Sequence, residues 1–502
     1  MKNDFSSPRR MSAGAFVIIA MKTFKELAGA FFFIFVSLLF APSDEQSFSE
    51  TMMRTAILTG IIVALSLLVA FLKYYYRKFH INDDKLIFTH GIVFRQTTSI
   101  PLDKIHNLRT KKGLLYQVLD LRGVTFDTIA NDQGDVELIL SESDWFMLLS
   151  HVREGEKATY TKDATVPPPI ATKDEIRKVS NSSILKGALC QNHLKGFSVL
   201  AACLAPVFNN LNELGSDTTD RIFDYIDTGA SEYLSSAGQW LCFFAVVYLI
   251  VVVLLTARIM LRYGNMTITI TGEKLTMSSG ILSRYTCRLS RDKATVITIK
   301  QNPLEKIAGC KTITIGQASN ASETKQWNEI RIYGSKLDEK VLDWWLNDSN
   351  HATEHPLMSA KSGKGVAVRK FIPHLLAAVV VTYVLVHFVG IMSLGVLIGS
   401  IYACLAGTRA IMAWKHSRIT LNKSYIKVNL GNIARISNYM RYCDIESVEI
   451  KCSPFTRFTY RVSLRLYTNA ETLSVYSLKI DSAVRLRNLI LSQPERDTLN
   501  NQ

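Results

Sequence analysis

Hydrophobic and polar positions along the chain follow two periodicities, which alternate three times. Long apolar runs such as Thr55–Leu72 are each followed, directly or after a partner run, by segments in which apolar and polar residues alternate. A run of about 20 apolar residues can cross a bilayer as a helix, whereas a period of two indicates a half-buried strand. The pattern therefore predicts membrane hairpins, each followed by a sheet domain.

Six apolar runs come close to the length of a membrane span, and they fall into three pairs. The pairs are Phe24–Ala41 with Thr55–Leu72, Gly196–Leu211 with Leu241–Ala257, and Phe371–Val389 with Ile391–Thr408. In the last run small residues recur at every fourth position, a pattern that favours close helix contact in lipid. These helix-packing candidates are Gly395, Gly399, Ala403 and Gly407.

The distribution of charge predicts how the hairpins are oriented. The segment between the second pair of runs carries six acidic residues from Glu213 to Glu232 and one basic residue, Arg221. The opposite ends of the runs are basic, for example at Lys73 and Arg77. Because basic residues concentrate on the cytoplasmic side, we expect both termini and all three sheet domains to be cytoplasmic.

A 16-residue frame follows each hairpin. It reads HINDDKLIFTHGIVFR from His80, TITGEKLTMSSGILSR from Thr269, and TLNKSYIKVNLGNIAR from Thr420, at offsets of 189 and 340 residues from the first copy. A repeat of this kind indicates one supersecondary unit used three times. The shared glycine follows the second predicted strand, where a turn requires positive φ. The repeated structural residues are Gly91, Arg95, Gly280, Arg284, Gly431 and Arg435.

Each copy ends in a predicted amphipathic helix that covers the open end of its antiparallel sheet. Polar, proline-rich or glycine-rich segments then separate one copy from the next hairpin. The predicted division is residues 1–72 for an N-terminal amphipathic segment and hairpin 1, 73–153 for domain 1, 154–183 for a linker, 184–261 for hairpin 2, 262–348 for domain 2, 349–370 for a linker, 371–413 for hairpin 3, and 414–502 for domain 3.

The motif hydrophobic-x-x-x-x-(Leu/Ile)-x-x-x-x-Gly-x-x-x-Arg, directly after a membrane helix, resembles that of the bacterial pleckstrin-homology (PH) membrane proteins. The threefold plan of hairpin plus domain resembles their YdbT-like group over nearly the whole chain. This resemblance implies a multi-pass protein of a bacterial inner membrane with three cytoplasmic α+β domains. Each domain would be a PH-like antiparallel sheet or partial barrel, capped by a C-terminal helix. It also implies a smaller membrane partner with a single PH-like domain.

A search for chemistry finds no nucleotide-binding, metalloprotease or hydrolase motif, and the eight cysteines are scattered. His374 and His387 lie in one predicted membrane helix but on different faces, which favours structural roles. Asp83 and Asp84 form an acidic pair in a predicted hairpin turn, where Asp is common. We therefore expect no catalytic residue, no metal site and no cofactor.

Basic residues are the more informative set, because the net charge is +15. The third copy, 409–491, holds 14 Lys or Arg against five Asp or Glu, whereas the first, 73–153, holds 11 against ten. On a predicted strand of the third copy, Arg457, Arg461 and Arg465 share one face. These arginines are candidate contacts for an anionic membrane surface. A solvated face that only follows the charge rule is the simpler interpretation, and we do not expect nucleic acid.

The leading hypothesis is a non-enzymatic membrane protein whose three domains serve as scaffold, docking or lipid-surface modules in a larger membrane complex. An oligomer of the chain itself is compatible with this hypothesis. Two alternatives stay open. Six helices could line a path in a transport or export system, although they contain almost no membrane-embedded carboxylate. A membrane enzyme acting on lipid is the other, although no acid–base or metal cluster is present in the sequence pattern.

Overall fold

A computed structural model describes most of the chain. It covers residues 5, 7–39, 48–83, 85–92, 94–101, 107–127, 136–148, 175–194, 196, 237–317, 329–348, 355–389, 392–452 and 458–500. The acidic segment 213–236, Asp84 and Arg457 lie outside the described residues.

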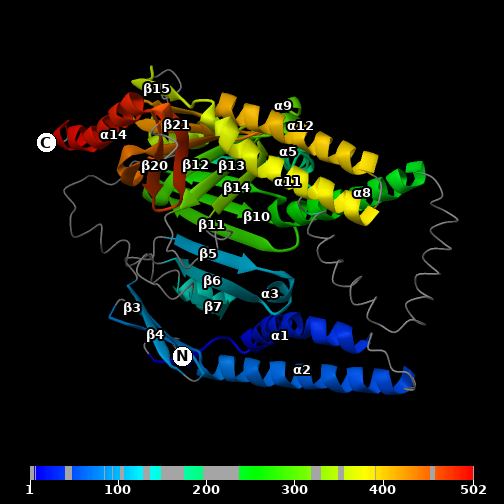
Figure 1. Cartoon of the computed structure of the whole chain (residues 1–502). Coiled ribbons are helices and arrows are strands. Elements are labelled where there is room, and N and C mark those ends of the chain that lie inside the picture. Colours follow the sequence, from blue (N-terminus) through cyan, green and yellow to red (C-terminus); the bar gives the residue numbers. More distant parts are fainter. Residues whose placement is uncertain are drawn as a thin grey trace.

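Among the described residues, four helices are long and apolar enough to cross a membrane. The spans are Thr59–Tyr76 in α2 (Phe48–Tyr76), Phe244–Tyr263 in α8 (Ala237–Tyr263), Gly365–Val384 in α11 (Gly365–Val389), and Gly395–His416 in α12 (Met392–His416). They confirm four of the six predicted runs. The long helices project toward the same side of the sheets (Figure 1), as one membrane requires.

The other two predicted runs are not among these spans. Phe24–Ala41 overlaps α1 (Ala15–Leu39), which begins nine residues earlier than the predicted run and pairs with α2 as a hairpin. The end of that run and nearly all of Gly196–Leu211 lie outside the described residues.

The strands in the described part of the chain form four antiparallel sheets. Within each sheet, neighbouring strands are hydrogen-bonded in the following order. The first contains β1 (Arg9–Arg10), β2 (Lys78–Asn82), β3 (Lys85–His90) and β4 (Gln96–Pro101). The second contains β7 (Val136–Ser141), β6 (Leu121–Asp127), β5 (Asn107–Lys112), β11 (Arg284–Ser290), β10 (Lys274–Ser279), β9 (Thr267–Thr271) and β8 (Glu175–Lys178). The third contains β14 (Glu329–Ser335), β13 (Lys311–Gln317), β12 (Ala294–Gln301), β18 (Arg435–Arg441), β17 (Tyr425–Leu430), β16 (Arg418–Leu421) and β15 (Met358–Lys361). The fourth contains β19 (Ile445–Lys451), β20 (Arg461–Thr468) and β21 (Thr472–Lys479).

The two seven-stranded sheets are shared between neighbouring copies of the repeat. In one, β5 of the first copy pairs with β11 of the second; in the other, β12 of the second pairs with β18 of the third. We call these contacts junction 1 and junction 2. Each copy therefore contributes strands to two different sheets, an arrangement that joins the three domains through backbone hydrogen bonds.

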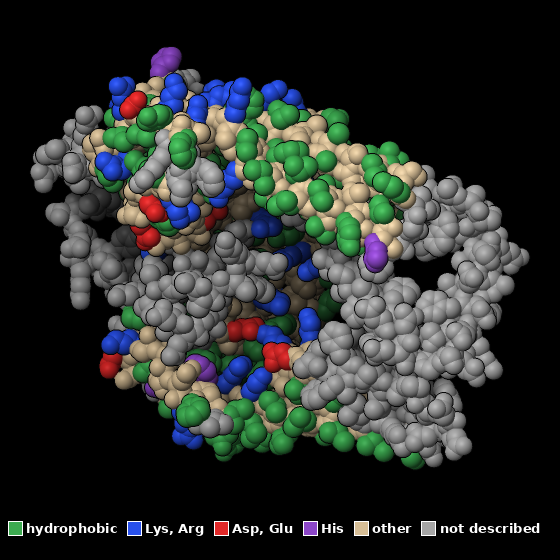
Figure 2. Space-filling view, in the orientation of Figure 1, with side chains coloured by type: hydrophobic (Ala, Val, Ile, Leu, Met, Phe, Trp, Pro, Cys, Tyr) green, Lys and Arg blue, Asp and Glu red, His purple; other side chains and the backbone are tan. Residues whose placement is uncertain are grey.

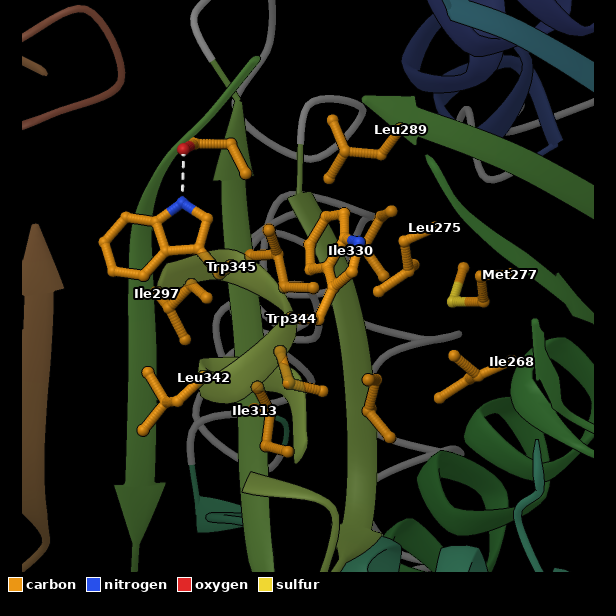
Figure 3. Packing of buried hydrophobic residues seen from close by; sticks show 14 of the residues in the cluster. Ile268, Leu275, Met277, Leu289, Ile297, Ile313, Ile330, Leu342, Trp344 and Trp345 are labelled. Carbon is orange, nitrogen blue, oxygen red and sulfur yellow. Dashed lines mark hydrogen bonds between the residues drawn. The ribbon is translucent and has the colours of Figure 1, made fainter. Parts of the chain in front are cut away.

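Three separate hydrophobic cores nevertheless correspond to the three copies. In the second copy, the closing helix α10 (Asp338–Leu346) buries Val341 and Trp345 against strands of both half-sheets, and the Trp345 indole donates to the Ala294 carbonyl at 2.6 Å (Figure 3). Residues 142–148 and α14 (Ile480–Asn500) close the first and third copies. The smaller helices are α3 (Leu114–Val118), α5 (Asn181–Leu189) and α9 (Pro303–Ile307), with 3-10 turns η2 (Arg291–Lys293) and η4 (Tyr442–Asp444).

The predicted linkers need correction. Residues 154–183 contain β8 and the start of α5, and residues 349–370 contain β15 and the start of α11. Together with β1, these short strands add an edge strand to a sheet just before each hairpin. They are too short and too polar to show a strand period, because an edge strand with one exposed side needs little apolar surface.

The repeat glycines have the backbone geometry that the frame predicts. Gly91, Gly280 and Gly431 adopt φ values of 109°, 114° and 117°. A Cβ at each would collide with the carbonyl oxygen three residues later. The frame therefore requires glycine for both conformation and space.

Small residues on α12 lie against α11. A Cβ placed on Gly399 would collide with the Thr382 hydroxyl, and one on Gly395 would lie 2.7 Å from Val386 Cγ2. Across the same helix pair, His374 Nδ1 lies 3.0 Å from the Tyr402 hydroxyl. His387 stacks on Tyr383 within its own helix, at a centroid distance of 5.9 Å. Both histidines thus have neighbours suited to structural roles.

Candidate anion-binding groove

A groove of about 700 Å³ lies where the third domain meets the start of α11. Its walls come from β15, the loop before α11, the end of α12, and the β20–β21 hairpin with the first turn of α14. Figure 2 shows Lys and Arg side chains gathered at this end of the molecule, beside the apolar surface of the helices. The residues that matter for its chemistry are Lys361, Lys364, Trp414, Arg461, Lys479 and Ser482.

The loop at the floor of the groove is held by hydrogen bonds on both sides. The Ser362 N–H donates to the Ser417 carbonyl at 3.1 Å, and the two serine hydroxyls lie 2.7 Å apart. The Trp414 indole donates to the Ser362 carbonyl at 3.1 Å. On the other side, the Gly363 N–H donates to the Ser477 carbonyl at 2.8 Å. The loop is thus fixed before any ligand binds.

Arg461 occupies the space that a side chain on Gly363 would need. Its guanidinium collides with a Cβ placed on Gly363, and it donates to the Ser477 carbonyl at 2.9 Å. Ser477 has a φ of 60° at a register shift between β20 and β21, which marks a β-bulge. The bulge therefore turns the Ser477 carbonyl toward both the loop and Arg461.

The groove is electropositive and lacks a compensating carboxylate among its lining residues in the described part of the chain. Lys361, Lys364 and Lys479 are exposed, so their ammonium groups are free to meet a ligand. Lys361 also lies over the Trp414 ring, 5.8 Å from its centroid. The first N–H groups of a long helix add a partial positive charge at the same place. Such a site suits a phosphate or another compact anion.

The three predicted arginines do not form one contact set. Arg461 lies in the groove, and Arg457 lies outside the described residues. Arg465 lies further along β20, 3.7 Å from a Glu449 carboxylate oxygen. A hydrogen bond with Tyr467 raises the pKa of Arg465, and the charge of Glu449 adds to this effect. Its charge is therefore already engaged.

Sequence reasoning missed the three lysines. Lys361 and Lys364 belong to the segment AKSGKG, which the pattern predicts to be part of a linker because this stretch is polar and glycine-rich. Lys479 lies at the end of the last strand. Two lysines flanking a glycine before a long apolar helix could have indicated the site, since glycines and helix starts often bind anions.

The position of Ser482 in the third copy is occupied by an aspartate in the first two copies. Leu121 pairs with Ser141, Lys311 with Ser335, and Arg461 with Lys479 at the end of each last hairpin. Three residues after these strand ends stand Asp144, Asp338 and Ser482. Asp144 pairs with Arg9 at 2.8 Å, and Asp338 pairs with Lys311. In the third copy, Lys479 and Ser482 replace the Ser and the Asp.

Three half-sheet pairs, each closed by a helix and preceded by apolar helices, define a membrane protein built from a repeated small domain. The bacterial PH domain family matches residues 28–155, 222–346 and 371–494, so the chain belongs to this family, with three copies.

Among individual proteins, the chain is similar to the UPF0699 transmembrane protein YdbT of Bacillus subtilis (strain 168). The two are 20% identical over 358 residues, which cover 68% of this chain and 69% of that protein. No solved structure matches the chain. The protein is therefore a distant homologue of YdbT, and it is a transmembrane protein with four candidate spans.

Proposed function

We propose that this protein is a non-enzymatic membrane scaffold whose PH-like domains face the anionic cytoplasmic leaflet and dock other proteins there. In this proposal both termini are cytoplasmic, and the third domain binds the phosphate of an anionic phospholipid headgroup. A smaller membrane protein with a single PH-like domain is the expected partner, as the likeness to YdbT-like proteins implies. Nucleic acid is not part of the proposal.

The single observation that carries the lipid part is the position of the groove. It lies at the first turn of α11, and the apolar span begins at Gly365. Trp414, at the end of the neighbouring span, has the amphipathic ring that favours the membrane interface. Cations at this depth meet lipid headgroups, and each contributes about 1 kcal/mol near an anionic leaflet.

The test uses the full chain, because junction 2 joins the third domain to the second. We would place the purified protein in phosphatidylcholine nanodiscs and measure its affinity for added fluorescent phosphatidylglycerol. A triple variant, Lys361→Gln with Lys364→Gln and Lys479→Gln, should bind this lipid more weakly by about fivefold for each charge removed. Inorganic phosphate serves as a competitor, to separate a headgroup site from a site for free phosphate.

The matched control removes three other exposed lysines and so changes the net charge equally. Its substitutions are Lys85→Gln, Lys336→Gln and Lys423→Gln. The control should bind phosphatidylglycerol as the unmodified protein does. Equal loss in both triple variants would show that only overall charge matters, and no loss in either would remove the lipid function from the third domain.

A further inference from the structure

Junctions 1 and 2 use the same strands of the repeat in the same register. In junction 1, Arg284 lies opposite Lys112; in junction 2, Arg435 lies opposite Gln301. Arg284 and Arg435 are the same frame position, and Lys112 and Gln301 are 189 residues apart, the offset between the first two copies. The contact between neighbouring copies is therefore a repeated, specific interface rather than an accident of one pair.

By the same repeat, two strands at the ends of the molecule lack the mate that their counterparts have. β4 corresponds to β11 and β18, and β19 corresponds to β5 and β12. Within the described part of the chain, β4 and β19 each end a sheet. The exposure of their side chains reflects this difference. Tyr439 of β18 is buried, whereas its counterpart on β4, Ser99, is exposed.

We infer that β19 of one molecule pairs with β4 of a second copy of this chain, head to tail, in the register of junctions 1 and 2. An open edge presents unpaired N–H and C=O groups that can hydrogen-bond to another strand. The two edges are complementary to each other, because each is the counterpart of the other's missing mate. One chain type thus contains both halves of the interface.

The extrapolated register can be stated residue by residue. Transferring junction 2 places Cys452 opposite Arg95, Lys451 opposite Gln96, and Glu449 opposite Thr98. Pro101 corresponds to Arg441, one position beyond the last pair of junction 2, so its missing N–H removes no interchain hydrogen bond. The proline therefore does not block this edge.

The polar character of the two edges does not exclude pairing. Junction 1 forms within this chain although it places Thr110 opposite Thr286 and Lys111 opposite Tyr285. Cross-strand threonine pairs stabilise a sheet, and polar edges keep the unpaired state soluble. We therefore expect an interface that opens and closes, in contrast to the apolar junction 2, where Val296 and Ile297 are buried.

The membrane favours this geometry over other ways of adding a strand. The relation between successive copies places the long apolar helices α1, α2, α8, α11 and α12 on one side of the sheets (Figure 1). Repeating that relation at β19 would put the hairpins of the next molecule in the same membrane. Contacts between unlike surfaces produce rings or open rows rather than symmetric dimers. The expected product is thus a planar series of molecules.

The experiment needs one substitution, because Cys452 is native and exposed. The Cα atoms of directly opposed residues in an antiparallel pair lie about 4.5–5.5 Å apart, within reach of a disulfide. Full-length Arg95→Cys protein, purified and reconstituted alone in phosphatidylcholine vesicles, is oxidised and run on a non-reducing gel. We expect covalent dimers and larger species, and their loss when Cys452→Ser is added.

A second pair guards against a local effect of the first. The second pair is Thr98→Cys with Glu449→Cys. Thr98 corresponds to Asn438 and Glu449 to Thr298, and the Thr298 and Asn438 side chains hydrogen-bond at 2.8 Å across junction 2. Thr97→Cys with Glu449→Cys places the thiols on opposite faces and should not cross-link. Cross-linking of the Arg95→Cys protein that persists after Cys452→Ser would overturn the proposal. So would equal cross-linking of the Thr97→Cys and Thr98→Cys proteins that carry Glu449→Cys.

Absence of cross-linking in both designed pairs would also overturn it. Were cross-linking in native membranes to yield a disulfide only to a smaller protein, that partner rather than a second copy would occupy the edge. Because the vesicles contain no anionic lipid, the result does not depend on the lipid function proposed above.

Discussion

The first and third copies of the repeat differ in whether the charged side chains beside their hairpins are paired. Beside the first hairpin, Arg9 pairs with Asp144, Lys22 with Glu137, and Lys73 with Glu26. Beside the third, Lys361, Lys364 and Lys479 surround a groove whose described lining contains no carboxylate.

The difference shows how a repeated fold acquires a local site without a change in topology. In the first two copies the Asp three residues after the last strand pairs with a cation. In the third copy Ser482 stands at this position, Lys479 ends the strand, and the exposed Asp481 lies in the first turn of α14 outside the groove lining. Paired charges hold elements of the same molecule together. Unpaired charges of one sign are available to a ligand, and they repel one another until an anion binds.

The largest effect should come from the repeat glycines. Gly431→Val forces a β-branched residue into positive φ, at a cost of about 1–3 kcal/mol, and its Cβ collides with the Ala434 carbonyl. Because β18 is paired with β12, we expect hydrogen exchange to increase in both the third and second copies. Gly91→Val should affect the first copy and leave the second unchanged, since β4 pairs with β3 and with no described strand of the second copy.

Ser99→Val is the matched control, because it adds a β-branched residue at an exposed strand position of the same copy. It should leave hydrogen exchange unchanged. If Gly91→Val increased hydrogen exchange equally in the first and second copies, strand pairing at the junctions would not determine which copies are destabilised.

The next effect concerns the groove. Lys479→Ser with Ser482→Asp gives the third copy the residues of the first. Removing one cation and adding one anion should weaken binding of phosphatidylglycerol by about 25-fold, at about 1 kcal/mol per charge. Fluorescence titration in nanodiscs measures this. Lys479→Ser with Ser482→Ala should show about half of the free-energy change, and an equal loss would mean that the new Asp plays no part.

The reverse substitution should have a smaller effect. Asp144→Ser leaves Arg9 without its carboxylate, and the Arg9 side chain is 26% exposed while that of Asp144 is 9% exposed. We expect a loss of about 1 kcal/mol, measured as faster hydrogen exchange in β1 and β2. Ser482→Ala, at the equivalent position of the third copy, should leave the hydrogen-exchange rates of β15 and β16 unchanged. If exchange at β1 stays the same in Asp144→Ser, the ion pair does not hold this strand.

The smallest effect should depend on pH. Burial alone would raise the pKa of Glu137, but the charge and hydrogen bond of Lys22, with the Tyr116 hydroxyl, hold that pKa below its usual value. Its stabilising contribution is therefore present above the unfolded pKa, about 4.3, and is lost as the pH falls through the lower folded value. Below pH 4 we expect faster hydrogen exchange where α1 meets β7. The free energy of local opening should fall by well under 1 kcal/mol, because the Lys22 and Glu137 side chains are partly exposed.

Glu137→Gln removes the titrating group and should abolish this pH dependence at α1. The groove beside the third hairpin offers the contrast, since its described lining contains no carboxylate. A similar acid response of β15 and the start of α11 would show that the response belongs to the whole molecule.

Local patterns in the sequence determined much of this protein. Apolar run lengths located the four spans that the structure confirms, and alternation located the strands of each copy. The positive φ of Gly91, Gly280 and Gly431 followed from one shared turn, and the Gly395–Gly407 stripe indicated which face of α12 meets α11. These features depend on residues close in sequence, so periodicity and residue chemistry suffice to predict them.

Only the tertiary structure decided which strands pair across copies and where the cations gather. β12 and β18 are separated by more than 130 residues, and the alternation within each is equally compatible with a free edge. The groove joins Lys361, Arg461 and Lys479 from three segments, and a β-bulge at Ser477 sets their arrangement. Long-range pairing depends on which edges meet in space, and no local pattern contains that information.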